Sequence, residues 1–100
     1  ESEYAVVPVD RPLAERNHTV TVAGKFCESG DVLARDVDLP EPETGELLAL
    51  PASGAYCLMM ASNYNMQTRP AVVLVNQGTS RLIRRRETYK DLLASSIDFD

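Results

Sequence analysis

Residues 19–39 read TVTVAGKFCESGDVLARDVDL and contain the clearest strand pattern of the chain. Its first residues alternate threonine with valine, and residues 32–39 end in an alternation of aspartate with valine and leucine. Period-two alternation is typical of strands with one dry and one wet face. The stretch therefore predicts two strands joined by a loop, residues 24–31, which contains glycines, a thiol and carboxylates.

Short apolar runs separated by turn-forming residues continue along the rest of the chain, as is typical of an all-β domain. Two prolines and a glycine predict a loop over residues 40–46. The run AVVLV at residues 71–75 is apolar on every side and predicts a strand buried on both faces. The residues that follow, Asn76-Gln77-Gly78, predict a hairpin turn. Further strands are expected at residues 4–9, 47–50 and 81–84.

Two segments predict short helices. Residues 56–61, YCLMMA, are apolar on every face, which suits one or two turns of buried helix. Residues 88–93 begin with Thr88, followed three positions later by Asp91, and this spacing resembles a capping box. The sequence thus predicts one mainly β domain over residues 1–100, with one or two short helices.

The charge balance argues against several classes of partner. A net charge of −5 over 100 residues disfavours nucleic acid and anionic membrane, because both reward a basic surface. No apolar run approaches the ~20 residues that span a bilayer. The four arginines within residues 81–86 are interpreted as the solvated end of a strand rather than as a phosphate site. With two distant cysteines, Cys27 and Cys57, and no recognisable signal peptide, we expect a cytoplasmic protein with free thiols.

The chain lacks the residue patterns of several common kinds of catalytic and metal-binding site. One histidine, His18, and two distant cysteines do not have the spacing of a zinc site, so we expect no metal. The nucleophile motif G-x-S-x-G of serine hydrolases is absent, as are the glycine-rich phosphate and dinucleotide motifs.

The loop over residues 24–31 is the informative segment. It places Cys27 beside Glu28 and near Asp31, and carboxylates close to a thiol disfavour its thiolate form. A thiol that keeps its proton suits a proton donor better than a nucleophile, although an inert cysteine in an acidic loop is the alternative. The small residues Ser53 and Gly54, with Tyr56, form a candidate phosphate contact, but small-residue loops are common.

Cys27-Glu28-Ser29-Gly30-Asp31 resembles the C-E-S-x-D motif of diaminopimelate decarboxylases, which are relatives of ornithine and arginine decarboxylases with an alanine-racemase-like fold. The ornithine-type relatives carry aspartate after the cysteine, so Glu28 favours the diaminopimelate branch. Further matches follow in the family's order, at residues 54–56, 60–65, 69–71 and 85–89.

The resemblance implies a two-domain enzyme that uses pyridoxal 5'-phosphate. A (β/α)8 barrel carries the lysine that binds the cofactor, and a C-terminal β-domain, a β-barrel or sandwich, matches the present chain. The family's active site lies at a homodimer interface, where the neighbouring subunit supplies the cysteine loop. Lys25 and Lys90 do not match the cofactor lysine, so the isolated chain is expected to be inactive.

The resemblance also implies a role for each matched residue. Cys27 is the proton donor, and Glu28 binds the distal ammonium of meso-diaminopimelate. Tyr56 reaches both the cofactor phosphate and the substrate. Asp31 and Tyr64 are supporting groups. Without the barrel, an apolar surface around residues 56–64 is expected to be uncovered.

Two other functions fit the same residues. The chain could be a freestanding β-domain that serves dimerisation or regulation, or it could belong to a decarboxylase of another basic amino acid. Glu28 argues against the second alternative.

Overall fold

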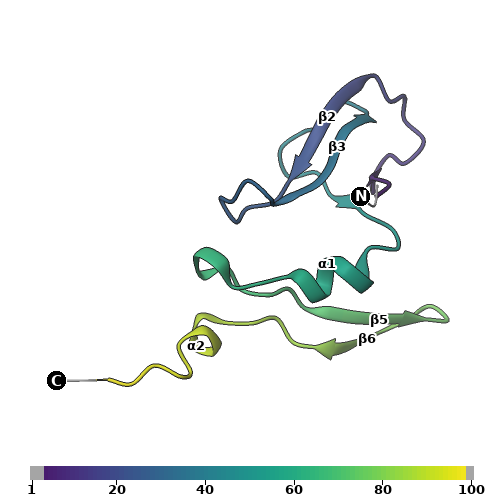
Figure 1. Cartoon of the computed structure of the whole chain (residues 1–100). Helices are drawn as coiled ribbons and strands as arrows, with labels where there is room; N and C mark the ends of the chain where they lie inside the picture. The colour runs from purple at the N-terminus through teal and green to yellow at the C-terminus, as the bar shows by residue number, and fades with distance from the viewer. Residues whose placement is uncertain (1–3, 99–100) are drawn as a thin grey trace. The chain divides into compact units, whose positions relative to one another are not determined.

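The computed structural model describes residues 4–98, and it divides the chain into two compact units, Glu1–Met60 and Ala61–Asp100. Within residues 4–98, six strands form three two-stranded antiparallel sheets. Figure 1 labels two of the pairs, β2 with β3 and β5 with β6. The predicted mainly β fold with short helices is confirmed, and between residues 4 and 98 no sheet closes into a barrel. The strands are β1 (Val7–Pro8), β2 (His18–Ala23), β3 (Val32–Leu39), β4 (Leu48–Ala49), β5 (Val72–Asn76) and β6 (Thr79–Arg84), and the helices are α1 (Gly54–Met60), the 3-10 turn η1 (Tyr64–Met66) and α2 (Tyr89–Leu92).

The β2–β3 hairpin of the first unit confirms the alternation that predicted it. Val20 and Val37 face each other across the sheet and are half-buried, while Thr19 and Asp38 form an exposed pair joined by a 2.7 Å hydrogen bond. The register shifts after Val20, and Asp36 adopts a left-handed φ of 51° near the irregularity. Such a bulge bends and twists the hairpin.

The core of the first unit is small. Leu39 at the end of β3 is 1% exposed, and Val6 and Pro8 are also buried. Arg16 ties these two segments together, because its guanidinium donates to the carbonyls of Val6 at 3.0 Å and Asp38 at 3.2 Å. The predicted strand over residues 4–9 is shorter than expected: only Val7–Pro8 pairs with β4, and beyond it one backbone hydrogen bond, from the N–H of Val9 to the carbonyl of Leu47 at 3.0 Å, continues the contact.

A charged clasp closes the loop that precedes β4. Arg11 donates to both carboxylate oxygens of Glu46, at 2.6 and 3.0 Å, and the N–H of Glu43 donates to Glu46 at 3.0 Å. These contacts lower the pKa of Glu46 to about 2, first through the hydrogen bond from Arg11 and then through the backbone N–H. The predicted loop over residues 40–46 is thus confirmed and held by a bidentate ion pair.

In the second unit, the predicted turn between β5 and β6 is confirmed. Gln77 and Gly78 both have left-handed φ values, 50° and 77°, which is the type I′ geometry of tight hairpins. Burial of β5 on both faces is wrong for this chain, because Val73 and Leu74 are each 51% exposed and Val75 is 71% exposed. A two-stranded hairpin satisfies its inner backbone groups but covers neither of its own faces.

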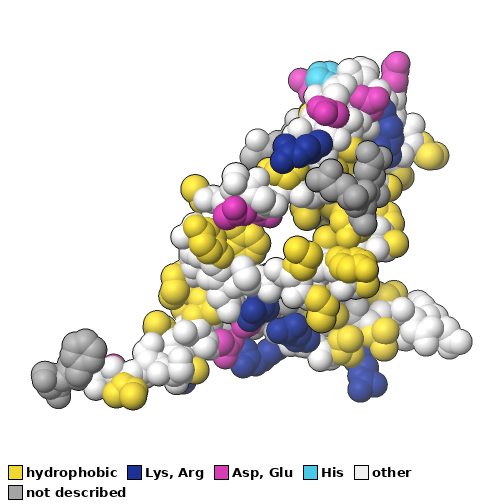
Figure 2. All heavy atoms as spheres, viewed as in Figure 1, with side chains coloured by type: hydrophobic (Ala, Val, Ile, Leu, Met, Phe, Trp, Pro, Cys, Tyr) yellow, Lys and Arg dark blue, Asp and Glu magenta, His cyan; other side chains and the backbone are white. Residues whose placement is uncertain are grey.

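The two longer helices follow their sequence signals in part. The helix α2 begins with the predicted capping box, in which Thr88 and Asp91 exchange hydrogen bonds between side chain and backbone. The helix α1 forms where expected, but it is not buried, since Met59 is 69% and Met60 78% exposed. Hydrophobic side chains accordingly reach the surface on the face drawn in Figure 2.

The remaining expectations concern thiols, arginines and membrane spans. Cys27 and Cys57 are free thiols, as predicted. The four arginines of residues 81–86 are all exposed, as predicted, and Arg85 pairs with Asp91 at 2.6 and 2.9 Å. Within residues 4–98, no helix has the length and apolar character that crossing a membrane requires.

The clasp predicts how the first unit responds to acid. A carboxyl group whose pKa is lowered in the folded state stabilises the fold above its unfolded pKa, and this contribution is lost as the pH falls. For Glu46 the loss should occur between pH 4.5 and about 2. A carbon-13 NMR titration of the Glu46 carboxyl should give a midpoint near 2, and Arg11→Gln should raise it. A midpoint near 4.5 in the unsubstituted chain would contradict the clasp.

Candidate functional site

Backbone hydrogen bonds close the predicted cysteine loop between β2 and β3. The N–H of Gly24 donates to the carbonyl of Asp31 at 2.9 Å, and the N–H of Asp31 donates to the carbonyl of Glu28 at 3.0 Å. The carboxylate of Asp31 accepts a further bond from the N–H of Phe26 at 3.0 Å. Asp31 therefore organises the loop through both its backbone and its side chain.

Gly24 is needed for this closure because of the space it leaves. A Cβ at position 24 would overlap both oxygens of the Asp31 carboxylate. Any other residue would push that carboxylate away from the N–H of Phe26. Glycine is favoured at position 24 because a Cβ there would clash with Asp31, and not because the backbone is left-handed.

Cys27 lies at the exposed part of the closed loop. Its φ is 59°, in the left-handed region that costs a non-glycine residue roughly 1–2 kcal/mol. The hydrogen bonds of Asp31 on the far side of the loop oppose this cost. The thiol is thus presented to solvent by a backbone conformation that the loop imposes.

Glu28 is exposed and turns its carboxylate toward its own loop. One oxygen accepts from the N–H of Gly30 at 2.7 Å, and the other accepts from the Ser29 hydroxyl at 3.4 Å. A carboxylate has about four acceptor positions, so both oxygens can accept further bonds. The side chain can therefore take an ammonium donor without leaving its contact with Gly30.

Tyr56 lies in the first turn of α1, and its side chain is 67% exposed. The N–H groups of Tyr56 and Cys57 donate to the carbonyl of Ser53, at 3.3 and 2.9 Å. Because the N–H of Tyr56 already has this partner inside the helix, its contact with an anion must come from the phenol. The Ser53 hydroxyl donates to the carbonyl of Leu50 at 2.7 Å, which fixes the start of the helix.

The structure adds one residue near α1 that the sequence did not indicate. Tyr4 hydrogen bonds with the side chain of Cys57, and its pKa is raised, first by desolvation and then by this bond and by the charges of Cys57 and Tyr56. Tyr4 follows no motif, and only the fold brings it 53 positions along the chain to Cys57.

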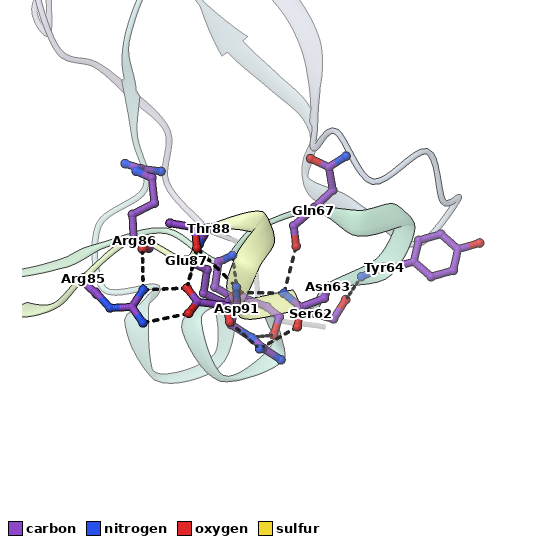
Figure 3. A network of polar contacts seen from close by, with 11 residues as sticks. Ser62, Asn63, Tyr64, Gln67, Arg85, Arg86, Glu87, Thr88 and Asp91 are labelled. Carbon is purple, nitrogen blue, oxygen red and sulfur yellow. Dashed lines mark hydrogen bonds and ion pairs between the residues drawn. The ribbon is translucent and has the colours of Figure 1, made fainter. Parts of the chain in front are cut away.

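Tyr64 belongs to the second unit and lies in a strained turn. The two residues after it, Asn65 and Met66, are both left-handed, with φ values of 52° and 61°, and neither is glycine. The Tyr64 side chain is 52% exposed. In Figure 3 its ring points away from the polar network beside it.

That network joins three side chains, Asn63, Arg69 and Glu87. Arg69 donates to the carbonyl of Ala61 at 3.0 Å and to Asn63 Oδ1 at 2.9 Å. Glu87 Oε1 accepts from Asn63 Nδ2 at 2.8 Å and from the N–H of Arg69 at 2.6 Å, while Asn63 Nδ2 also donates to the carbonyl of Gln67 at 3.0 Å. The pKa of Glu87 is lowered, chiefly by the N–H of Arg69 and then by Asn63.

Sequence reasoning missed this network, although a signal exists. Arg69 and Glu87 flank the β5–β6 hairpin, and in an antiparallel hairpin the two flanking positions face each other. The backbone confirms the pairing, because the N–H of Glu87 donates to the carbonyl of Arg69 at 3.1 Å. Asn63 has no comparable signal.

The predicted site residues fall into three groups. Cys27, Glu28 and Asp31 come together in one loop, Tyr56 lies on α1 of the same unit, and Tyr64 lies in the second unit. Within the described residues, no hydrogen bond joins Cys27 to Tyr56. A cavity of about 300 Å³ in the second unit contains none of the five, since it is lined by Arg84, Arg85, Glu87 and Asp91.

Comparisons with known proteins agree on one family. The family model described as "Pyridoxal-dependent decarboxylase, C-terminal sheet domain" matches residues 1–54. A diaminopimelate decarboxylase of Synechocystis sp. is 56% identical over 93 residues, which are 93% of this chain and 20% of that protein. The chain thus spans about a fifth of the length of this relative.

Solved structures of another such enzyme have a similar fold. Diaminopimelate decarboxylase from M. jannaschii superimposes with a TM-score of 0.85 at 39% identity, covering 97% of this chain and 22% of that one. Its complex with L-lysine superimposes with a TM-score of 0.82 at 40% identity, covering 94% and 21%.

The loop geometry predicts opposite outcomes at two glycines. Gly24→Ala should break the bond between Phe26 and Asp31 and lower the free energy of unfolding by about 0.5–1.5 kcal/mol, the net contribution of a typical hydrogen bond. Gly54→Ala meets nothing within 4 Å and should leave stability unchanged or slightly raised. Urea unfolding, with the amide NMR signal of Phe26 as a local probe, measures both variants. Equal stability of the two would show that the close approach at Gly24 is unimportant.

Proposed function

Because this chain belongs to the family of pyridoxal-dependent decarboxylase C-terminal sheet domains, we propose that it is the C-terminal part of a diaminopimelate decarboxylase. The reaction converts meso-2,6-diaminopimelate to L-lysine and carbon dioxide. The observation that carries the proposal is the closed loop that presents the Cys27 thiol beside the Glu28 carboxylate. High identity to a relative with this activity supports it.

The cofactor of the parent enzyme is pyridoxal 5'-phosphate, which acts as an electron sink for the substrate carbon when bound. The residues of this chain fit one edge of its site. The exposed phenol of Tyr56 can donate to a phosphate oxygen, and α1 holds it at a defined position. The two lysines, Lys25 and Lys90, have no assigned role, and the lysine that binds the cofactor belongs to the barrel of the parent.

The loop residues handle the proton and the substrate, and in the homodimer the loop of each subunit serves the site of its neighbour. Cys27 holds a proton on Sγ and delivers it to the substrate carbon that has lost carbon dioxide. Glu28 accepts a charge-assisted hydrogen bond from the distal ammonium of the substrate, which selects substrates with a second amine. Asp31 supports both by keeping the loop closed, and Tyr64 is a further supporting group.

The site is completed by parts that the chain itself does not contain. These are the (β/α)8 barrel of the same enzyme and a partner subunit in a homodimer, so the isolated chain is inactive. The apolar residues that stand exposed on α1 and on the β5–β6 hairpin support this, because large exposed apolar patches mark contact surfaces.

Replacing the thiol tests the proton-donor role. In the parent enzyme, Cys27→Ala should lower kcat by about 10²–10⁴-fold, the usual contribution of a positioned general acid. Cys57→Ala removes the other free thiol and should keep most of the turnover. Release of carbon dioxide from meso-diaminopimelate measures both variants, and normal turnover of Cys27→Ala would remove the assignment.

Replacing the neighbouring carboxylate tests substrate selection. Glu28→Gln keeps the shape but loses the charge, and it should lower kcat/KM for meso-diaminopimelate by about tenfold to a hundredfold, mainly through KM. Glu41→Gln, an exposed acid outside the loop, is the matched control. Steady-state kinetics of the two variants give the comparison, and an unchanged KM for Glu28→Gln would exclude the contact.

A further inference from the structure

The turn that carries Tyr64 does not hold its shape through its own preferences. Asn65 and Met66 are consecutive left-handed residues, and although asparagine tolerates that conformation better than most residues, methionine avoids it. Inside the turn, the N–H of Met66 donates to the carbonyl of Asn63 at 2.9 Å. Without further support, a turn of this kind relaxes to commoner backbone angles.

Arg69 supplies support from outside the turn. Its guanidinium bonds the carbonyl of Ala61, just before the turn, and Oδ1 of Asn63 at its start. One planar group thus sets the distance between two points of the incoming chain. Lysine cannot do the same, because its ammonium is a single point charge without the fork of donors.

Glu87 completes the support by fixing both Asn63 and Arg69. Its two carboxylate oxygens accept from Asn63 Nδ2 and from both the backbone and the side chain of Arg69. The Arg69 and Glu87 side chains are 31% and 19% exposed, so water competes with these bonds only in part. Asn63 also donates a hydrogen bond to the carbonyl of Gln67, which fixes the end of the turn.

We propose that Asn63, Arg69 and Glu87 are positioning residues that hold the Tyr64 turn in the geometry used by the active site. This inference rests on the proposed function, because Tyr64 is a supporting group of that site. The network acts through Tyr64 and does not itself touch the substrate. Small displacements of a positioned group cost activity steeply, so a loosened turn lowers catalysis even when the fold survives.

The ionisation of Glu87 fits this role. A glutamate is charged at neutral pH, and the contacts that lower the pKa of Glu87 extend the charged state of the network toward more acidic pH. The charged groups that face it are the guanidinium of Arg69 and, across the cavity that it helps to line, Arg84, Arg85 and Asp91. The turn therefore keeps one geometry across the neutral range.

A double-mutant cycle in the parent enzyme tests the proposal. Arg69→Lys should lower kcat/KM by about tenfold or more, and Tyr64→Phe should lower it as well. The double variant should be no worse than the poorer single variant, because both changes remove the same contribution. Multiplying effects would overturn the proposal, since a purely structural role of Arg69 acts independently of the Tyr64 hydroxyl.

Arg85→Lys is the matched control. It weakens the bidentate pair with Asp91 in the same unit but touches no residue of the turn. It should keep kcat/KM close to that of the unsubstituted enzyme, even where its melting temperature falls as far as that of Arg69→Lys. An equal loss of kcat/KM in the two variants would overturn the proposal. Glu87→Gln, which retains a carbonyl acceptor, replaces Arg69→Lys in the cycle if the latter does not fold.

Hydrogen exchange gives a readout that does not depend on activity. In the parent, Arg69→Lys and Glu87→Gln should speed amide exchange over residues 61–67, and Arg85→Lys should not. Unchanged exchange in both network variants would overturn the positioning role. A parent that releases no carbon dioxide from meso-diaminopimelate would refute the proposed function, while the exchange result would still judge the network.

Discussion

The carboxylate of Asp31 lies against the backbone of Gly24 and accepts the N–H of Phe26, and the site depends on this contact. It closes the loop at the end of the β2–β3 hairpin, so that the residues between can take an unfavourable shape. Cys27 is left-handed and exposed because its neighbours on both sides are held. The arrangement combines a glycine without a side chain at position 24 with an aspartate that accepts the N–H of Phe26.

The second unit also contains a strained segment beside a carboxylate that accepts a backbone N–H. The Tyr64 turn also contains left-handed residues other than glycine, and a carboxylate, Glu87, accepts a backbone N–H beside it. In each unit a half-buried acid therefore lies beside a strained segment that carries an exposed candidate site residue, Cys27 or Tyr64. Strain of this kind persists only where the surroundings determine the backbone more strongly than its own preferences do.

Exposure of the apolar residues has a different origin. The β5 and α1 segments are apolar on every side, which is typical of segments that are buried from water. Within the chain, one hairpin and seven helical residues cannot cover those faces, so Val75 and Met60 stay open. The apolar pattern of a segment indicates that its side chains favour burial, but whether they are buried depends on which other elements pack against that segment.

The sequence was enough to predict the segments whose structure is set by residues close to one another in the chain. The alternation over residues 19–39, the Gln77–Gly78 turn and the Thr88–Asp91 capping box each involve groups a few positions apart, so the sequence determined them. It also determined the composition of the cysteine loop. The contacts of Tyr4 with Cys57 and of Arg11 with Glu46 join positions 53 and 35 apart and follow from the folded path of the chain alone, whereas the contact of Arg69 with Glu87, 18 positions apart, is indicated by their places on either side of the β5–β6 hairpin. Such pairs depend on how the intervening chain turns, and side-chain hydrogen bonds form only when that path brings their atoms within about 3 Å.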